Sequence, residues 1–500
     1  MQYFHSIMLN AGVYAPLLGA VVIVALWTYM GARSVRGIAM AAASVSLLSA
    51  LSLWADYFLE LSAGGKGVAV FSDYMGFLPA FGLNGISMPM YALAGIVGFA
   101  ATYWAVISKM ENPRLYFTLL LFMQGGLMGA FASTNVLWMY MFHEFALVPT
   151  FIAMTIWGGA GKRIAAIQMA IYLTLGALVS LAGIIALYMQ TDAASFEFGA
   201  IVQAMAAAPL DASWQGWIFA LLLFGLGTLV SLFPFYSWAP RGYAAAPTSF
   251  AMLHAGVLKK FGLYVLIQVA VPLLPVGAIE WGWTLAVLAL FNVIYIGLVT
   301  MAQRDLKLMV SYSSVAHMGL CFLGIASMSV IGAGGAVVLM FGHGLSVALL
   351  FLLSNVITNR TEQWDMLQMG GLYKQTPVLA AMFVMAIMAS IGLPGFANFW
   401  GELSVLVSLW DFSPAICALG ATGIIISAVY GLRAVARIFM GEPSEWISKR
   451  FGAIADISVK ERIPAIILIA ALMFVGFCPK SVTKGLDADM KDIPAYSESK

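Results

Sequence analysis

The sequence predicts an all-α, polytopic membrane protein. Of its 500 residues, 62% are hydrophobic and 9% are charged, well below the share of about 25% charged residues that is usual in soluble domains. Its mean hydropathy is +0.95, and its 49 glycines suit the close approach of helices within a membrane. The alternating pattern of about ten residues that marks the strands of a membrane β-barrel does not occur. These observations favour a helical bundle.

Apolar runs long enough to cross about 30 Å of hydrocarbon predict about 14 transmembrane helices. The runs lie near 13–31, 37–59, 86–108, 114–134, 136–159, 164–189, 215–236, 247–273, 278–302, 308–327, 331–357, 376–412, 413–440 and 462–479. Two of them are interrupted, one between Gly225 and Pro234 and the other at Pro394. A broken helix at membrane depth is tolerated where it lines a cavity or is buried in protein.

The basic residues of the connectors predict the orientation of the chain. One set of connectors holds Arg33, Arg36, Lys109, Arg114, Lys162, Arg163, Arg241, Arg304, Lys307, Arg360, Lys374, Lys449, Arg450, Lys460 and Arg462. The other set, before the C-terminal tail, holds only Lys66. The positive-inside rule therefore places the basic connectors in the cytoplasm and both ends of the chain outside. The large outer connectors are 60–85 and 190–214, and we expect the polar tail Lys480–Lys500 to be loosely ordered.

Several classes of function find no support in the sequence. Cys321, Cys417 and Cys478 lie far apart and lack the spacing of a disulfide framework or a metal cluster. Phosphate-binding, dinucleotide-binding and nucleophile motifs are missing. Because the first basic residue is Arg33, we also expect no cleaved signal peptide. We therefore predict no redox site, cofactor or metal in this chain, and no nucleic-acid partner.

A sparse set of ionisable side chains remains inside the apolar runs, although charge in hydrocarbon is costly and is a functional hypothesis by default. These residues are Glu144, Glu402, His143, His254, His317, His343, Lys259 and Lys260. Desolvation disfavours the charged form of each such group and so helps it to exchange protons near neutral pH. Spread over several helices, the set has the chemistry of a proton relay.

The two carboxylates are the stronger candidates. Glu144 lies in WMYMFHEFALVP, where it either pairs with a neighbouring helix or takes part in transport, and the cost of burial favours transport. The zinc motif HExxH fails because position 147 is leucine. Glu402 follows the interruption Leu393-Pro394-Gly395, a context that again favours function.

The basic candidates carry more open alternatives. Lys259 and Lys260 are adjacent, hence about 100° apart around a helix, so they cannot share a face. We favour Lys260 as the relay member and Lys259 as a packed or snorkelling residue. His317 and His343 fit a relay and a satisfied core histidine equally well, and His254 is a weaker candidate.

Five sequence blocks resemble the antiporter-like subunits of respiratory complex I, most closely the M-type subunit. The blocks are FHEFALVPTFIAMTIWGG, FPFYSWAP with AAAPTSFAMLHAGVLKKFGLY, RDLKLMVSYSSVAHMG, FGHGLSVALLF, and MGGL with GLPGFANFWGE. They occur in the family's order between about residues 80 and 440. The same ancestry includes subunits of multisubunit Na+/H+ antiporters.

The resemblance implies a fold and a set of roles. The fold would have N-terminal helices in 1–110, inverted five-helix repeats in 111–275 and 276–440, each with one broken helix, and a last helix with a polar tail in 441–500. By position, Glu144 matches the family's fifth-helix glutamate, Lys260 its eighth-helix lysine, and Glu402 the charged residue of the broken twelfth helix. His317 and His343 match histidines on its central hydrated axis.

One departure from the family is serious. The lysine that the family usually carries in the broken seventh helix, as partner of the fifth-helix glutamate, is Leu229 here. The position of a lysine that is common in the family's sixth helix holds Gln168 here. The family's Pro-Asp-Ala-His after the seventh helix is replaced by Pro240-Arg241-Gly242-Tyr243. Without its cation, Glu144 would stay protonated more readily. The N-terminal half-channel would then be altered or inactive, or a neighbouring chain would supply the cation.

The function that the resemblance implies is proton translocation in the membrane arm of a complex I-type NADH:quinone oxidoreductase. Flavin, iron–sulfur clusters and quinone are then expected in partner subunits, namely a redox peripheral arm and related membrane subunits set in lipid. The alternatives are a subunit of a multisubunit Na+/H+ antiporter and a largely structural subunit with a degenerate N-terminal half-channel. The expected location is a bacterial inner (cytoplasmic) membrane.

Overall fold

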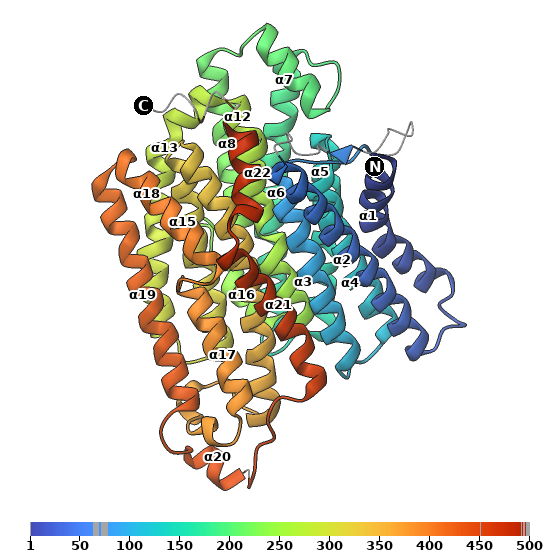
Figure 1. The fold of residues 1–500 in the computed structure, drawn as a ribbon, viewed down its shortest axis with the longest axis vertical. Coiled ribbons are helices and arrows are strands. Elements are labelled where there is room, and N and C mark those ends of the chain that lie inside the picture. Colours follow the sequence, from blue (N-terminus) through green and yellow to red (C-terminus); the bar gives the residue numbers. More distant parts are fainter. Residues whose placement is uncertain are drawn as a thin grey trace.

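The chain folds into a bundle of long helices, as seen in a computed structural model (Figure 1). The structure describes residues 2–63, 70–71, 79–450, 452–491, 493 and 496, so Lys66 lies outside the described residues. The first helices are α1 (Gln2–Ala25), α2 (Ala32–Ser62), α3 (Ser87–Ile107) and α4 (Pro113–Ala132). Between α2 and α3, β1 (Val70–Phe71) pairs antiparallel with β2 (Gly82–Leu83), Val70 opposite Leu83.

The helices that follow contain two irregular features, breaks and π-helical turns. The first group comprises α5 (Val136–Trp157), α6 (Lys162–Thr191), α7 (Phe198–Ala207), α8 (Ala212–Val230), α9 (Trp238–Ala245), α10 (Thr248–Leu253), the π-helix η1 (His254–Leu258), α11 (Lys260–Val265), the π-helix η2 (Leu266–Ala270) and α12 (Val271–Leu273). The second comprises α13 (Pro275–Leu290), the π-helix η3 (Phe291–Ile296), α14 (Gly297–Ala302), α15 (Leu306–Ala326), α16 (Val330–Thr361), the 3₁₀ turns η4 (Met366–Gln368) and η5 (Leu372–Lys374), α17 (Pro377–Ser390), α18 (Ala397–Phe412) and α19 (Pro414–Phe439). The chain ends with α20 (Glu445–Arg450), α21 (Val459–Phe477) and α22 (Lys480–Met490).

The all-α membrane fold is confirmed, but the count of fourteen spans is not. Within the described residues, 12 helices are long and apolar enough to cross a bilayer, and the count reaches 13 if the bent pair Val459–Phe477 and Lys480–Met490 is one span. The run predicted over 376–412 forms two shorter helices, α17 and α18. The connector 190–214 contains the helix α7, which periodicity did not predict.

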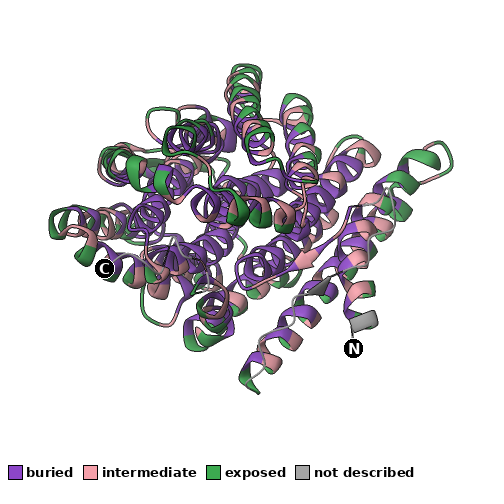
Figure 2. Cartoon of the chain, turned by 90° about the horizontal axis from the view of Figure 1, so that it is seen from above, coloured by how far each residue is buried: buried purple, intermediate pink, exposed green. Residues whose placement is uncertain are grey.

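The most deeply buried helix is α16, whose apolar window is 100% buried. It packs against α15, α17, α18 and α21. Seen from above, buried helices occupy the centre, and helices with exposed outer sides surround them (Figure 2). Exposed isoleucines and leucines on α6 are normal for a helix that faces lipid. The core helices are therefore the ones that can hold ionisable groups away from lipid.

The backbone groups at the break after α8 are hydrogen-bonded by one side chain from another helix. Ser231 takes a φ of +70°, and the Phe233–Pro234 peptide is cis. The amide of Asn292, on η3, accepts the Phe233 N–H at 2.7 Å and donates to the carbonyl of Ser231 at 2.9 Å. It also donates to the Val315 carbonyl on α15 at 3.2 Å. Backbone groups that a break frees must be satisfied inside the protein, and Asn292 does this here.

The break between α17 and α18 depends on glycine. Gly392 takes a φ of +80°, in the left-handed region that favours glycine. A Cβ atom at this position would collide with the carboxylate of Glu402. The break thus brings backbone close to a buried acid.

The expectation of a loosely ordered tail is wrong for residues 480–490. These residues form α22, which packs on α2 and α16. Val482, Leu486 and Met490 are buried at a spacing of four residues, which gives the helix one apolar face. The indole of Trp54 on α2 donates to the Ser481 carbonyl at 2.9 Å and fixes the start of the helix.

Candidate functional site

The centre of the bundle holds a direct contact between two ionisable side chains. The ammonium nitrogen of Lys260 lies 2.9 Å from Nδ1 of His343 and donates a second hydrogen bond to the carbonyl of Ala255. Lys260 is 0% exposed and His343 is 2% exposed. Lys260 begins α11, separated by one residue from the end of the π-helical turn η1, and π-helical turns often mark functional sites. When Lys260 is charged, its ammonium donates and Nδ1 accepts; when Lys260 is neutral, the direction can reverse, so one proton can be shared between them.

His317 on α15 lies next to His343 and extends the Lys260–His343 pair into a row of ionisable side chains. The two imidazole rings have centroids 5.4 Å apart. Nδ1 of His317 lies 2.8 Å from the Ser313 carbonyl, and Nε2 lies 2.8 Å from the Ser390 carbonyl at the end of α17. Each carbonyl can accept an N–H, so the ring fits both neutral tautomers and the doubly protonated form. That property suits a group that gains and loses protons.

Glu402 on α18 is 3% exposed and lies next to the break at Gly392. It lines a small internal cavity together with His317, Ser427 and Tyr430. The structure therefore brings Lys260, His343, His317 and Glu402 into one continuous region, with the residues coming from α11, α16, α15 and α18.

Glu144 lies apart from this region and closer to the edge of the bundle. Its side chain is 29% exposed, and its Oε1 lies 3.4 Å from Nδ1 of the preceding residue, His143. The His143 ring stacks on Phe261, the residue after Lys260, at 4.2 Å. Leu229 is buried and apolar. Among the described residues, the basic side chain within ion-pair distance of Glu144 is thus a histidine.

Lys259 is buried, at 2% exposure, so its snorkelling is excluded. Its ammonium donates to the Ser314 carbonyl at 3.4 Å and lies 5.4 Å from the centre of the Tyr243 ring. That ring also meets His254, with centroids 5.1 Å apart. The two lysines therefore face different neighbours, as their adjacency predicts.

Tyr243 and Tyr430 are polar members of the site that sequence reasoning missed. Both are buried, and the hydroxyl of Tyr243 has no hydrogen-bond partner in the described structure. A tyrosine in an apolar run looks like ordinary packing, so only the departure Pro240-Arg241-Gly242-Tyr243 could have drawn attention to Tyr243.

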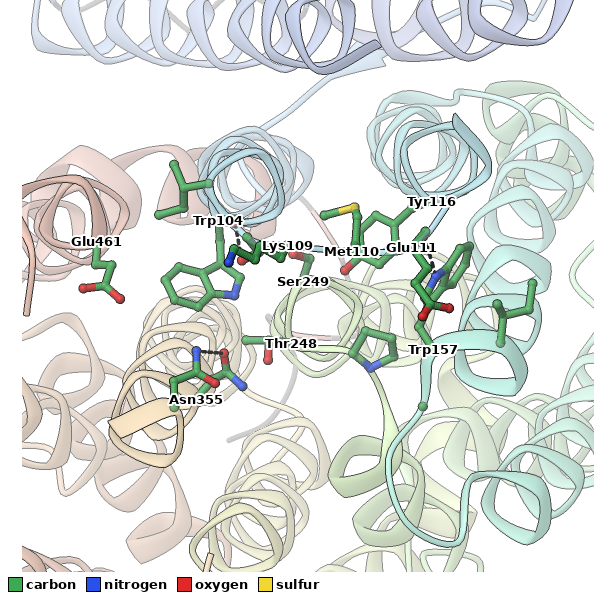
Figure 3. A pocket seen from close by; sticks show the side chains of 16 residues that line it. Trp104, Lys109, Met110, Glu111, Tyr116, Trp157, Thr248, Ser249, Asn355 and Glu461 are labelled. Atoms are coloured by element: carbon green, nitrogen blue, oxygen red, sulfur yellow. Dashed lines mark hydrogen bonds between the residues drawn. The ribbon is translucent and has the colours of Figure 1, made fainter. Parts of the chain in front are cut away.

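A cavity of about 680 Å³ lies at the end of the bundle that carries basic connectors (Figure 3). Its lining includes Lys109, Glu111, Thr248, Ser249, Asn355 and Glu461. Thr248 and Ser249 open α10, the helix that leads to the two lysines. The described residues contain no group of His, Cys, Asp and Glu side chains suited to a metal.

Comparison with known proteins points to one family. Residues 133–427 match the family described as "NADH:quinone oxidoreductase/Mrp antiporter, TM". The chain is 31% identical over 506 aligned positions to NAD(P)H-quinone oxidoreductase chain 4 3 of Trichormus variabilis, covering 98% of this chain and 91% of that protein.

Two solved structures share the fold. A chain of respiratory complex I from Thermus thermophilus with bound NADH superposes with a TM-score of 0.84 at 27% identity, over 95% of this chain and 97% of that one. A chain of the Mrp complex from Dietzia sp. gives a TM-score of 0.84 at 19% identity, over 98% of both chains. The second likeness is one of fold alone.

Proposed function

Because this integral membrane chain belongs to the NADH:quinone oxidoreductase/Mrp antiporter transmembrane family, we propose that it is a proton-translocating membrane-arm subunit of a complex I-type quinone oxidoreductase. The observation that carries the proposal is the 2.9 Å contact between Lys260 and His343 in the buried core. Burying an amine and an imidazole at membrane depth is costly, and an ionisable residue kept there is a functional hypothesis by default.

The proton path follows the row of contacts. The Lys260 ammonium gives its proton to Nδ1 of His343, and Lys260 becomes a neutral amine. His343 passes the proton to His317 across a gap between rings that a rotamer change or one bridging water spans. His317 then protonates the carboxylate of Glu402, with which it shares a cavity. Glu144, with His143, supplies the opposite end of the row, beside Phe261.

The chain moves protons with energy from elsewhere. Moving one proton against about 150–200 mV costs about 3.5–4.6 kcal/mol, and no fuel-binding motif occurs in the sequence. Redox partner subunits that hold flavin, iron–sulfur clusters and quinone would supply this energy. Redox chemistry in those subunits would be coupled to proton transfer along the row through helix movements or through electrostatic interactions between charged groups.

The antiporter alternative shares the fold, so the fold does not separate the two functions. Overall similarity favours the oxidoreductase, at 27% identity to the complex I chain against 19% to the Mrp chain. We also propose that the membrane is the bacterial inner membrane and that both chain ends lie outside, because basic residues crowd the opposite connectors. Protease access to a tag after residue 500 in sealed spheroplasts tests the orientation.

The test of the function uses the purified complex that contains this chain, reconstituted into liposomes. We expect it to oxidise NADH, reduce quinone and acidify the lumen, and we expect Lys260→Met to reduce proton translocation per NADH while the complex stays assembled. Sodium-dependent proton exchange without redox subunits would support the antiporter instead. Full pumping by Lys260→Met would contradict the proposed role of the row.

A further inference from the structure

The two buried lysines at the start of α11 have unequal surroundings. Lys260 is held by the imidazole of His343 and by a backbone carbonyl. Lys259 has one long hydrogen bond, 3.4 Å to the Ser314 carbonyl, and an aromatic ring. None of the ion pairs among the described residues includes Lys259. Such weak support makes a permanently charged ammonium expensive at this place.

Three residues that contact Lys259 carry unpartnered polar atoms. Oη of Tyr243, Nδ1 of His254 and Oγ of Ser314 are all buried and have no hydrogen-bond partner in the described structure. Their residues are between 0% and 2% exposed. Buried polar atoms are nearly always satisfied, so three exceptions around one amine require an explanation. Each of these atoms can accept or pass a proton.

These groups lie between Lys259 and the basic end of the bundle. His254 is five residues before Lys259, toward Thr248, which opens α10 and lines the large cavity. Tyr243 is on α9, and the carbonyl of Ala245 at the end of α9 accepts the N–H of Gly159 in the connector after α5 at 2.8 Å. His254 and Tyr243 therefore belong to segments that run from that end of the bundle toward Lys259.

We propose that Lys259 is a second proton-binding amine of the row, and that His254 and Tyr243 pass protons to it from the cavity at the basic end. Lys259 receives the proton as a neutral amine. It hands the proton to Lys260 after Lys260 has protonated His343, so the number of protons is conserved at each step. The inference rests on the function proposed above, because it adds a member to the same relay.

The other ionisable groups that face Lys259 come from five elements. They are Tyr243 on α9, His254 on η1, Lys260 on α11, His317 and Cys321 on α15, and His343 on α16. This set consists of bases, a phenol and a thiol, without a carboxylate. A positive charge on Lys260 therefore opposes a second one on Lys259, which makes the two amines exchange one proton rather than hold two.

The test compares Lys259→Met, Tyr243→Phe and Lys260→Met in the reconstituted complex. Tyr243→Phe is the sharpest variant, because it removes a hydroxyl that makes no hydrogen bond and keeps the ring. We expect Lys259→Met and Tyr243→Phe each to slow proton translocation by about 100-fold or more, the range typical of a lost proton-transfer group, and to change its pH profile. Leu258→Met, a buried apolar change next to the pair, should leave both unaltered.

The outcomes separate this inference from the proposed function. If Lys260→Met abolishes pumping while Tyr243→Phe and Lys259→Met pump with the parental rate and pH profile, Lys259 is only packed and the inference is overturned. If Lys260→Met itself pumps normally, the relay as a whole is contradicted. Should Lys259→Met not assemble, Tyr243→Phe decides, since a structural role of the ring predicts no change.

Discussion

At the residue scale, the site depends on which polar atoms have partners. Lys260 and His343 satisfy each other, and the two ring nitrogens of His317 face carbonyls. Glu402 lines a small cavity, and its carboxylate approaches Gly392 closely because glycine has no Cβ atom there. The acid at the end of the row therefore shares a cavity with His317, the group that would protonate it.

Replacing Glu402 by Gln tests this end of the row. The amide keeps the volume and cannot titrate, so we expect Glu402→Gln to assemble normally and to lose proton translocation by about tenfold or more. The measurement is lumenal acidification per NADH in proteoliposomes. Glu442→Gln is the matched control, because Glu442 is 83% exposed and its contact with Lys374 is a surface pair of the kind that contributes little.

The sequence predicted Lys260 and Glu402 as candidates, because charge in an apolar run is rare. It could not show that Lys259 is as deeply buried as Lys260, since adjacency only says that the two face different ways. Nor could it single out Tyr243, whose aromatic ring is indistinguishable from packing in an apolar sequence. Those facts depend on helices that are distant in the chain.

At the scale of the element, the helix breaks are the features that sequence predicts best. Proline and glycine mark both, after α8 and between α17 and α18. The π-helical turns are less clearly marked, because LIQVA (η2) and FNVIYI (η3) contain neither residue and HAGVL (η1) contains only Gly256. One of them directly precedes the lysine pair and so determines which way Lys259 and Lys260 point.

Gly392→Ala tests the second break. The new methyl group would require a φ near +80° and would meet the Glu402 carboxylate, so we expect displaced Glu402, weaker assembly and reduced pumping. Thermal denaturation of the solubilised complex measures the stability, with a loss of about 1–3 kcal/mol. Gly37→Ala in α2, where an added Cβ meets nothing, should be neutral, and equal losses in both variants would refute the local explanation.

Asn292→Leu tests the first break. The apolar side chain leaves the Phe233 N–H and the Ser231 carbonyl without their partner, at a cost of about 1–3 kcal/mol for each group. We expect a lower melting temperature and less subunit in purified membranes. Asn359→Leu removes an exposed amide on α16 and should change neither quantity. Normal stability of Asn292→Leu would mean that the break is held by other contacts.

At the scale of the whole molecule, burial orders the helices around α16. The all-α membrane class followed from composition, whereas the number of spans did not, because the run 376–412 divides into the short helices α17 and α18 and because α21 qualifies as a span only together with α22. The C-terminal helix α22 lies back on α2 and α16. Chain segments more than 400 residues apart are joined there, as by Trp54 and Ser481.

Deleting residues 480–500 tests this closure. The change uncovers the surface that receives Val482, Leu486 and Met490, and each buried apolar side chain of this size stabilises by about 1.5–3 kcal/mol. We expect a lower melting temperature with the proton row intact, so that pumping per NADH persists in complexes that assemble. Loss of pumping at unchanged stability would instead give α22 a direct part in transport.

The amide of Asn292 ties the kinked backbone after α8 to the carbonyl of Val315, two residues from His317. A movement of α15 would therefore be transmitted to that kink through the single side chain of Asn292. α15, which carries His317, cannot slide along η3 without first breaking the hydrogen bond from Asn292 to the Val315 carbonyl, so such a displacement would come as an abrupt step and not as a gradual drift.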